Sequence, residues 1–379
     1  MRQSLSSSLR VVEHENQYPD CIWLGLDVDS ASSLESDQIE LFLTMRWGEQ
    51  RQSIEDGSVQ FGLTGSELQI HLVNAAWVET STHLASDTAV IERISHHHDA
   101  NHATWRFQTP PTSILRGELT RITLATIRPT ASSCRLEAML AIAPVDIRLT
   151  EAEGLWRHDI TPNQHAVLER VFARQLHQTT VHPFPSWMQL CYECPSPCPK
   201  IADRVSQVMN GASAETLESL VRPLVHHVMD AQTQDLLELA SRVGLTPSQD
   251  FAGGNLLGVT LIGAELSEAN LERVNLRGAD LSDAELSEAN LNDAVLSGAD
   301  LSGADLGSAT LQAANLHRAS LALANLGGAH LQAANLLEAN LTNTNLNGVK
   351  VEQARFGRNP GMTDALKASL QQRGAIFED

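Results

Sequence analysis

Three cysteines that lie close together, Cys191, Cys194 and Cys198 in "CYECPSPCPK", form the pattern with the clearest chemical potential. A C-x2-C pair followed by a third cysteine can supply thiolates to zinc, and C-x3-C-P is also part of an iron–sulfur ligand run. The segment itself holds no fourth ligand. His177, His182, Cys21 or Cys134 could supply one only if the fold brings it near. We therefore predict no metal and no cofactor, and interpret the segment as an interdomain linker with reduced thiols; a metal site is the alternative.

A second cluster is rich in imidazole groups. The segment "SHHHDANH" contains His96, His97, His98, Asp99 and His102. These are metal-binding residue types, but adjacent histidines in a loop rarely form a closed site. We expect a solvated loop.

A third cluster has the residue types of acid–base catalysis. The segment "EGLWRHDITPNQH" contains Glu153, His158, Asp159 and His165. Carboxylates and imidazoles can transfer protons, but neither a nucleophile motif nor a phosphate-binding loop accompanies them. We interpret the segment as a turn and predict no catalytic residues.

Length and charge restrict the possible functions. The chain has 379 residues, which indicates two or three domains, and 46 acidic against 26 basic residues give a net charge of -20. This charge argues against direct binding of nucleic acid through its phosphates. We find neither an apolar run long enough to span a membrane nor the apolar core of a signal peptide at the start of the chain. We therefore predict a cytoplasmic protein without membrane insertion.

The first half of the chain contains short runs typical of β-strands. Seven runs between residues 18 and 150, among them "IELFLTMRW" and "ELQIHLV", are separated by Gly, Ser, Asp, Asn and Pro. This spacing predicts an antiparallel β-sandwich or barrel. The helical pattern of "NQHAVLERVFARQL" is expected to close this domain, which we assign to residues 1–190.

Leucine recurs every fifth residue in the second half, a period that fits neither a helix nor a strand. Alanine precedes the leucine by two positions in fifteen of nineteen cases, and Asn or Asp precedes it directly in twelve. Nineteen exposed leucines would form a large apolar patch, so the leucines must point inward with the alanines. These predicted core residues are Leu256, Leu261, Leu266, Leu271, Leu276, Leu281, Leu286, Leu291, Leu296, Leu301, Leu306, Leu311, Leu316, Leu321, Leu326, Leu331, Leu336, Leu341 and Leu346.

These residues resemble the pentapeptide-repeat family, whose motif A-(D/N)-L-x-x stands in "ANLER", "ADLSD" and "ADLSG". The resemblance implies a right-handed quadrilateral β-helix over residues 251–356, in which four pentapeptides form one square coil. The tail is similar to the C-terminal ends of multidomain pentapeptide-repeat proteins abundant in cyanobacteria. We expect residues 357–379 to form a cap with a helix from Thr363 to about Arg373.

Residues 191–250 join the two halves. They contain the cysteine segment and two helical patterns, one with Pro223 inside it and one over about residues 232–243 that ends at Gly244. We expect these helices to cap the first coil, because an open stack of strands recruits other chains.

The function predicted from these parts is a non-catalytic interaction or scaffold protein with an unidentified protein partner. All six tryptophans, the residue type that often dominates binding energy, precede residue 190. We therefore expect the N-terminal domain to bind the partner and the rod to orient it. Two alternatives stand beside this one. The first is a metal-binding regulator or enzyme with its site in the N-terminal domain or at the cysteine cluster of Cys191, Cys194 and Cys198. The second is an acidic rod that mimics DNA and binds a topoisomerase, as some family members do.

Overall fold

The computed structural model describes residues 10–18, 20–29, 38–54, 57–81, 84, 91, 93–156, 159–181, 184–192, 201–202 and 216–378. The chain forms two compact units. The first contains Met1–Glu153 and Gln175–Leu217, and the second contains Gly154–Arg174 and Glu218–Asp379. The expected domain boundary at residue 190 differs from this division, because residues 154–174 pack with the repeat unit.

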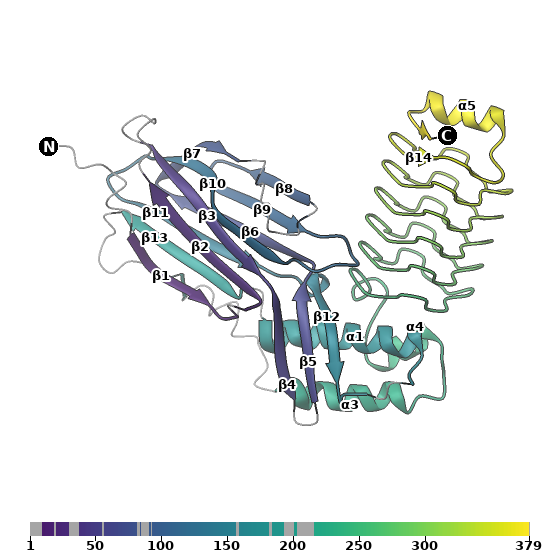
Figure 1. Cartoon of the computed structure of the whole chain (residues 1–379), viewed down its shortest axis with the longest axis horizontal. Coiled ribbons are helices and arrows are strands. Elements are labelled where there is room, and N and C mark those ends of the chain that lie inside the picture. The colour runs from purple at the N-terminus through teal and green to yellow at the C-terminus, as the bar shows by residue number, and fades with distance from the viewer. Residues whose placement is uncertain are drawn as a thin grey trace. The chain divides into compact units, whose positions relative to one another are not determined.

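The first unit is built on two antiparallel sheets (Figure 1). The six-stranded sheet has the order β1 (Arg10–Asn16), β13 (Ser186–Tyr192), β11 (Cys134–Ala141), β6 (Gly65–Val73), β9 (His102–Gln108), β8 (Arg93–His98). The four-stranded sheet has the order β2 (Ile22–Asp29), β3 (Ile39–Trp47), β10 (Gly117–Pro129), β7 (Ala75–Thr80). The predicted antiparallel β-sandwich is therefore confirmed, and each of the seven predicted runs lies on a strand.

Alternation of apolar and polar residues places one face of each sheet in the core. In β3 every second residue from Ile39 to Trp47 is buried, and in β6 Leu68, Ile70 and Leu72 are buried between half-buried neighbours. The indole N–H of Trp47 donates to Ser66 Oγ of β6 at 3.2 Å, and its ring lies 5.4 Å from that of Phe107 on β9. These contacts join the two sheets through their inner faces.

A smaller three-stranded sheet extends the first unit. Its order is β12 (Ile147–Glu153), β5 (Gly57–Leu63), β4 (Glu49–Ile54), and a short 3-10 helix, η2 (Pro144–Asp146), precedes β12. Arg51 of β4 contacts Glu151 at 2.6 Å and Glu153 at 3.3 Å, which fastens the two outer strands across β5.

Helix α1 (Pro162–Leu176) is the exception to the expected domain assignment. Ala166, Val167, Leu168 and Val171 belong to the same buried cluster as the first coils of the rod, together with residues of α3 (Leu217–Met229) and α4 (Leu236–Arg242). The helix therefore caps the rod rather than closing the sandwich. A short π-helix, η3 (His177–Val181), follows it.

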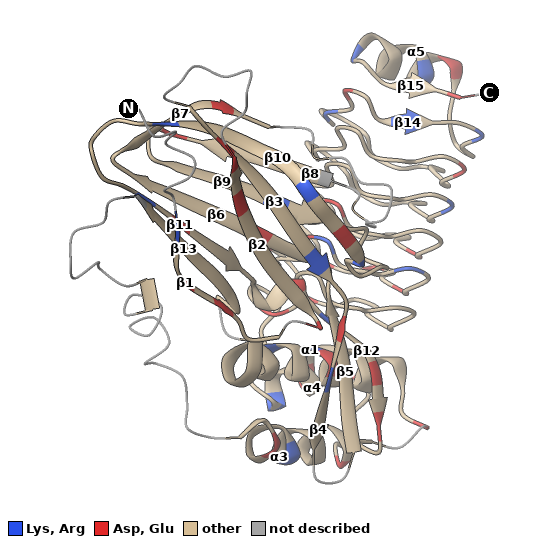
Figure 2. Cartoon of the chain, turned by 60° about the vertical axis from the view of Figure 1, so that its left-hand side comes forward, with Lys and Arg blue, Asp and Glu red and all other residues tan. Residues whose placement is uncertain are grey.

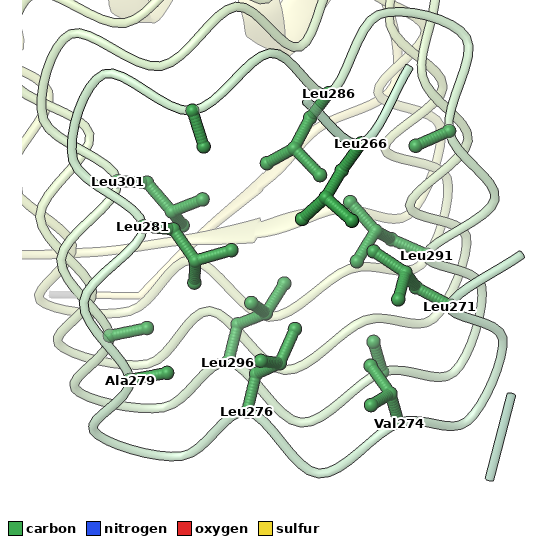
Figure 3. Close-up of a cluster of buried hydrophobic side chains, with 14 of the residues drawn as sticks. Leu266, Leu271, Val274, Leu276, Ala279, Leu281, Leu286, Leu291, Leu296 and Leu301 are labelled. Carbon is green, nitrogen blue, oxygen red and sulfur yellow. The ribbon is translucent and has the colours of Figure 1, made fainter. Parts of the chain in front are cut away.

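The rod is a right-handed quadrilateral β-helix, as predicted. Parallel β-bridges join residues twenty apart, from Asn255–Asn275 to Asn335–Arg355, so four pentapeptides form one coil. All nineteen leucines of the register are buried, and none is more than 6% exposed. Figure 3 shows the leucines of successive coils stacked inside the square, for example Leu276 beneath Leu296 and Leu281 beneath Leu301.

Each corner of the square is a tight turn. The N–H of the alanine donates to the carbonyl of the leucine three residues earlier, as in Ala304 to Leu301 at 3.1 Å. The second residue after each leucine has a positive φ, a backbone conformation that favours glycine. Residues with side chains, such as Arg273 and Glu268, adopt the same positive φ at this position, although it costs them backbone energy. The Asn or Asp before the leucine accepts from the N–H two residues later, as Asp300 Oδ1 does from Ser302 at 3.0 Å. This gives the recurring Asn and Asp a local structural role.

Helix α5 and two short strands end the rod. Strand β14 (Arg355–Phe356) pairs in parallel with β15 (Ile376–Phe377), α5 (Asp364–Gln372) lies between them in sequence, and Thr363 caps the helix through Leu366 N–H. The Phe377 ring stacks on that of Phe356 at 5.3 Å. The predicted terminal helical cap is confirmed.

Candidate interaction surfaces

The outer face of the four-stranded sheet gathers aromatic rings and arginines. We name it the aromatic–arginine face and define it by Trp23 on β2, Phe42 and Arg46 on β3, and Arg121 on β10. Trp23 opposes Arg46 across the pair β2–β3, and Asp27, four residues further on β2, opposes Phe42. The two rings are therefore about 14 Å apart along the strands, at roughly 3.4 Å per residue.

Trp23 lies flat on the sheet because the next position along the same face is Gly25. A Cβ at residue 25 would overlap the six-membered ring of the indole. The Arg46 guanidinium lies over the ring, 4.9 Å from its centroid, and its Nε contacts Glu118 Oε1 at 3.2 Å. The indole and the guanidinium thus form a cation–π stack whose arginine side chain is 55% exposed.

Phe42 carries a second stack of the same kind. The Arg121 guanidinium lies 4.4 Å from the Phe42 centroid and pairs with Asp29. Arg121 has a φ of 47°, its N–H donates to Thr44 Oγ1 at 3.1 Å, and the register of β10 shifts between Leu119 and Ile122. Bulges of this type re-aim a side chain at a cost in backbone energy. The sheet is thus locally distorted where it presents this arginine.

The acidic residues of the rod are unevenly distributed over its faces. Eight of the twelve acidic residues between 251 and 355 stand on two adjacent faces of its first three coils, and neither Lys nor Arg stands on those faces. Figure 2 colours the acidic residues of the chain red and its Lys and Arg residues blue. They are Glu265, Glu268, Asp280, Asp283, Glu285, Glu288, Asp300 and Asp305. Stacked β-layers put successive carboxylates of a column about 5 Å apart, a spacing comparable to that of charges on a polyanion.

The cysteine segment lies mostly outside the described residues. Cys194 and Cys198 fall there, whereas Cys191 stands on β13 and is disulfide-bonded. This differs from the interpretation of Cys191 as a reduced thiol. Cys21 and Cys134 are buried free thiols, and burial raises the pKa of Cys21 to about 12, so its thiol stays protonated.

The histidine segment is not the loop that we expected. His96, His97 and His98 form the end of β8, and only Asp99 to Asn101 make the turn into β9. His96 stacks on His98 at 5.2 Å and against Trp105 at 4.8 Å. Burial, followed by the neighbouring His98 and His97, lowers the pKa of His96. Alternation along β8 turns His96 toward the sandwich core, which a loop interpretation missed.

The candidate acid–base residues do not converge. Glu153 ends β12 and pairs with Arg51, whereas His165 lies on α1 with its ring against Trp156 at 6.0 Å. Asp159 is exposed, and His158 and His182 lie outside the described residues. Among the residues that the structure describes, no group of three or more His, Cys, Asp or Glu side chains is arranged to hold a metal ion.

The strongest buried polar cluster lies on the outer face of the six-stranded sheet. Glu137 is 2% exposed, with Arg135 Nε at 2.8 Å from one carboxylate oxygen and His71 Nδ1 at 3.8 Å from the other. The residue opposite Glu137 on β13 is Gln189, an amide rather than a nucleophile. Arg135 compensates the negative charge of the buried Glu137 carboxylate, so the arrangement is that of a structural ion pair.

The repeats match a known family. The model of the pentapeptide repeats fits eight copies over residues 250–283, 279–318, 289–326 and 319–358. The chain belongs to the pentapeptide-repeat family. No curated protein matches the chain by sequence. None of the helices in the described part of the chain is long and apolar enough to cross a membrane.

Three solved structures of pentapeptide-repeat proteins are similar to the chain. Rfr23 from the cyanobacterium Cyanothece 51142 is 39% identical over 26% of this chain and 63% of its own, with a TM-score of 0.24. HetL from Nostoc sp. PCC 7120, involved in heterocyst differentiation regulation, is 32% identical over 28% and 57%, with a TM-score of 0.19. A thylakoid-lumen protein of Arabidopsis thaliana is 31% identical over 33% and 77%, with a TM-score of 0.18. The chain thus spans less than two thirds of the first two proteins.

Proposed function

We propose that the protein is a non-catalytic scaffold whose N-terminal sandwich binds a protein partner through the aromatic–arginine face. The observation that carries this proposal is the pair of ring–guanidinium stacks on a rigid sheet, Trp23 with Arg46 and Phe42 with Arg121. Tryptophan and arginine dominate the energetics of protein interfaces, and their side chains lose little entropy when they are already stacked. The repeat rod then acts as a capped, stable support.

The test compares full-length variants for retention of host proteins. The double variant Arg46→Ala/Arg121→Ala removes both guanidiniums, which are about half exposed and outside the core. We expect this variant to bind the partner that the wild type retains with an affinity about tenfold lower or less. Arg51→Ala, on the three-stranded sheet of the same unit, is the matched control and should retain the partner. Equal retention by all three proteins would contradict the proposal.

Full-length variants are required because the units cannot be separated at residue 190. Helix α1 contributes to the core of the repeat unit, so a fragment that begins after residue 190 lacks part of its N-terminal cap. Such a fragment would expose the edge of its first coil and bind other chains nonspecifically.

DNA mimicry is the second candidate. The eight carboxylates on two adjacent faces of the first coils favour it, since a regular array of negative charge is what a DNA-binding protein recognises. Basic residues such as Arg318 and Arg355 stand further along the rod, so the anionic array covers only part of it. We expect the full chain to leave DNA binding by a type II topoisomerase unchanged; inhibition that is lost on charge reversal of Glu265 and Glu285 would favour the mimic.

We propose a cytoplasmic location, supported by the charge and by two buried free thiols. The disulfide at Cys191 is atypical of a reducing compartment. Thiol labelling of the protein immediately after lysis of its host tests this point. A free Cys191 in most molecules supports the cytoplasm, whereas a protected Cys191 supports an oxidising compartment.

A further inference from the structure

Two histidines oppose each other on the outer face of the six-stranded sheet. His71 of β6 and His102 of β9 are partners in the register of the two strands. Both side chains point away from the core, because the neighbouring Ile70, Leu72 and Ala103 are buried on the inner face. The His71 side chain is 38% exposed, and His102 is half-buried. Both imidazoles can therefore be reached from solvent.

The hydrogen bonds of the sheet bring these two side chains close together. Leu72 N–H donates to Asn101 O at 2.7 Å, so His71 and His102, one residue further in on each strand, form a non-hydrogen-bonded pair. Residues in such a pair have Cα atoms about 4.5 Å apart and Cβ atoms about 5 Å apart. Two imidazole nitrogens that bind one ion at about 2.1 Å each, in tetrahedral geometry, are about 3.4 Å apart. The spacing of the pair therefore suits a shared metal ion.

The backbone holds both positions in place. Strand β6 lies inside the sheet, between β9 and β11. At His102, Asp99 Oδ1 accepts from the backbone N–H at 2.9 Å and Asp99 N–H donates to the carbonyl at 2.8 Å, so the turn before β9 fixes this residue. Ligands on strands are positioned more precisely than ligands on loops.

Glu137 orients His71 from the other side. It opposes His71 on β11 and is 2% exposed, and its Oε2 lies 3.8 Å from His71 Nδ1. Because Nδ1 is buried, the exposed surface of the ring belongs to its other atoms, which include Nε2. The negative charge of Glu137 favours the tautomer with its proton on Nδ1, which leaves the lone pair on Nε2. A carboxylate behind a histidine in this way supports metal binding by the imidazole.

The pair has no third protein ligand among the described residues. His97 of β8 stands on the same face, but it opposes Thr104 rather than His102. In that part of the chain no group of three His, Cys, Asp or Glu side chains could hold a metal ion. An ion bound by two imidazoles keeps water in its remaining positions and is therefore exchangeable.

We infer that His71 and His102 together bind one divalent transition-metal ion through their imidazole nitrogens. Imidazole suits zinc, nickel and copper, and Cu²⁺ binds most tightly in this series. The site lies on the six-stranded sheet, whereas the aromatic–arginine face belongs to the four-stranded sheet, so the inference does not depend on the proposed function.

Equilibrium dialysis of the full-length protein against micromolar Cu²⁺ tests the site. The chain has 15 histidines, so the decisive quantity is the change in bound copper per chain rather than its total. His71→Gln and His102→Gln should each bind one ion fewer than the wild type, because one imidazole alone loses the chelate. The double variant should also bind one ion fewer and not two, since both histidines hold the same ion. The difference between the Cu²⁺ electron paramagnetic resonance spectra of wild type and double variant should show coupling to two nitrogens.

His330→Gln is the matched control. His330 is half-buried like His102, but its cross-strand neighbours on the rod are Thr310 and Lys350, so it has no imidazole partner there and its loss should leave the copper count unchanged. His102→Gln keeps the Glu137 cluster intact, so its count decides the test alone if His71→Gln fails to fold. Single variants that bind as much copper as the wild type, or a double variant that binds two ions fewer, would overturn the inference.

Discussion

The side-chain amide of Asn163 makes the two hydrogen bonds to Thr260 that a preceding coil of the rod would otherwise make. Within the rod the N–H and C=O of a bridging residue bond to the coil before it, as Asp280 does with Val259 and Leu261. Thr260 has no such coil, and instead Asn163 Oδ1 accepts its N–H at 2.9 Å while Asn163 Nδ2 donates to its carbonyl at 3.0 Å. The second hydrogen of the amide goes to Gln234 O at 2.8 Å.

Loss of this amide should destabilise the rod. Asn163→Ala leaves the backbone groups of Thr260 unsatisfied in a half-buried site, at a cost of about 1–3 kcal/mol. Asn163→Asp should cost at least as much, because a carboxylate cannot donate to Thr260 O or Gln234 O. Urea melts measure the difference. Asn347→Ala, at an exposed asparagine, should change the free energy of unfolding by less than about 0.5 kcal/mol.

The opposite end of the ladder is closed by Asn359 and Pro360. By the spacing of the ladder, Ala339 O should accept from the N–H of residue 360, but proline has none, and Asn359 Nδ2 donates there at 2.9 Å instead. Removal of residues 363–379 should expose Phe356 and Val351, which are now fully buried. We expect assemblies larger than those of the full-length chain by light scattering. A truncated protein with the same mass distribution as the full chain would show that the tail is dispensable as a cap.

The interior of the rod predicts a sharp contrast between neighbouring positions. Leu301 is fully buried, so Leu301→Ala should cost about 2–5 kcal/mol through lost burial and the cavity left behind. Leu301→Asp should cost more, because it buries a carboxylate without a partner. Ser297→Asp, at an outward corner near Arg277 and His317 of adjacent coils, should be nearly neutral. Equal denaturant midpoints for the two aspartate variants would contradict the inward orientation of the leucines.

The rod could be predicted from sequence because its period is rigid. A leucine at every fifth residue fits only an arrangement in which the leucines face inward, and each further repeat supports the same assignment. The association of α1 could not be predicted in the same way: the apolar face of residues 162–176 shows that the helix packs on a core, but not on which one. The role of Asn163 depends on that choice, since a single asparagine on a helix carries no signal of a partner 97 residues away.

The sandwich was predictable at the level of its strands and not at the level of its surface. Runs such as Ile39–Trp47 alternate clearly, whereas "SHHH" hides its alternation because all of its residues are polar. The stack of Arg121 on Phe42 requires a bulge in β10 that brings together residues 79 apart in sequence. Likewise, Gly25 stands two residues after Trp23 in "CIWLGLDV", but the sequence does not show that the indole lies over this glycine, where a Cβ would overlap it.

Two histidines should make stability depend on pH. Burial lowers the pKa of His165 below its ordinary value of 6.5, and burial with the neighbouring His98 and His97 lowers that of His96. A histidine with a lowered pKa in the folded state binds protons more readily when unfolded, so its contribution is fully present above the unfolded pKa and is lost as pH falls through about 6.5. The free energy of unfolding should therefore be lower at about pH 5.5 than at about pH 7.5. The double variant His96→Gln/His165→Gln should show a smaller difference in urea melts at the two pH values, whereas His227→Gln, at an exposed histidine of α3, should keep the wild-type difference. A pH dependence as steep in the double variant as in the wild type would assign the effect to other groups.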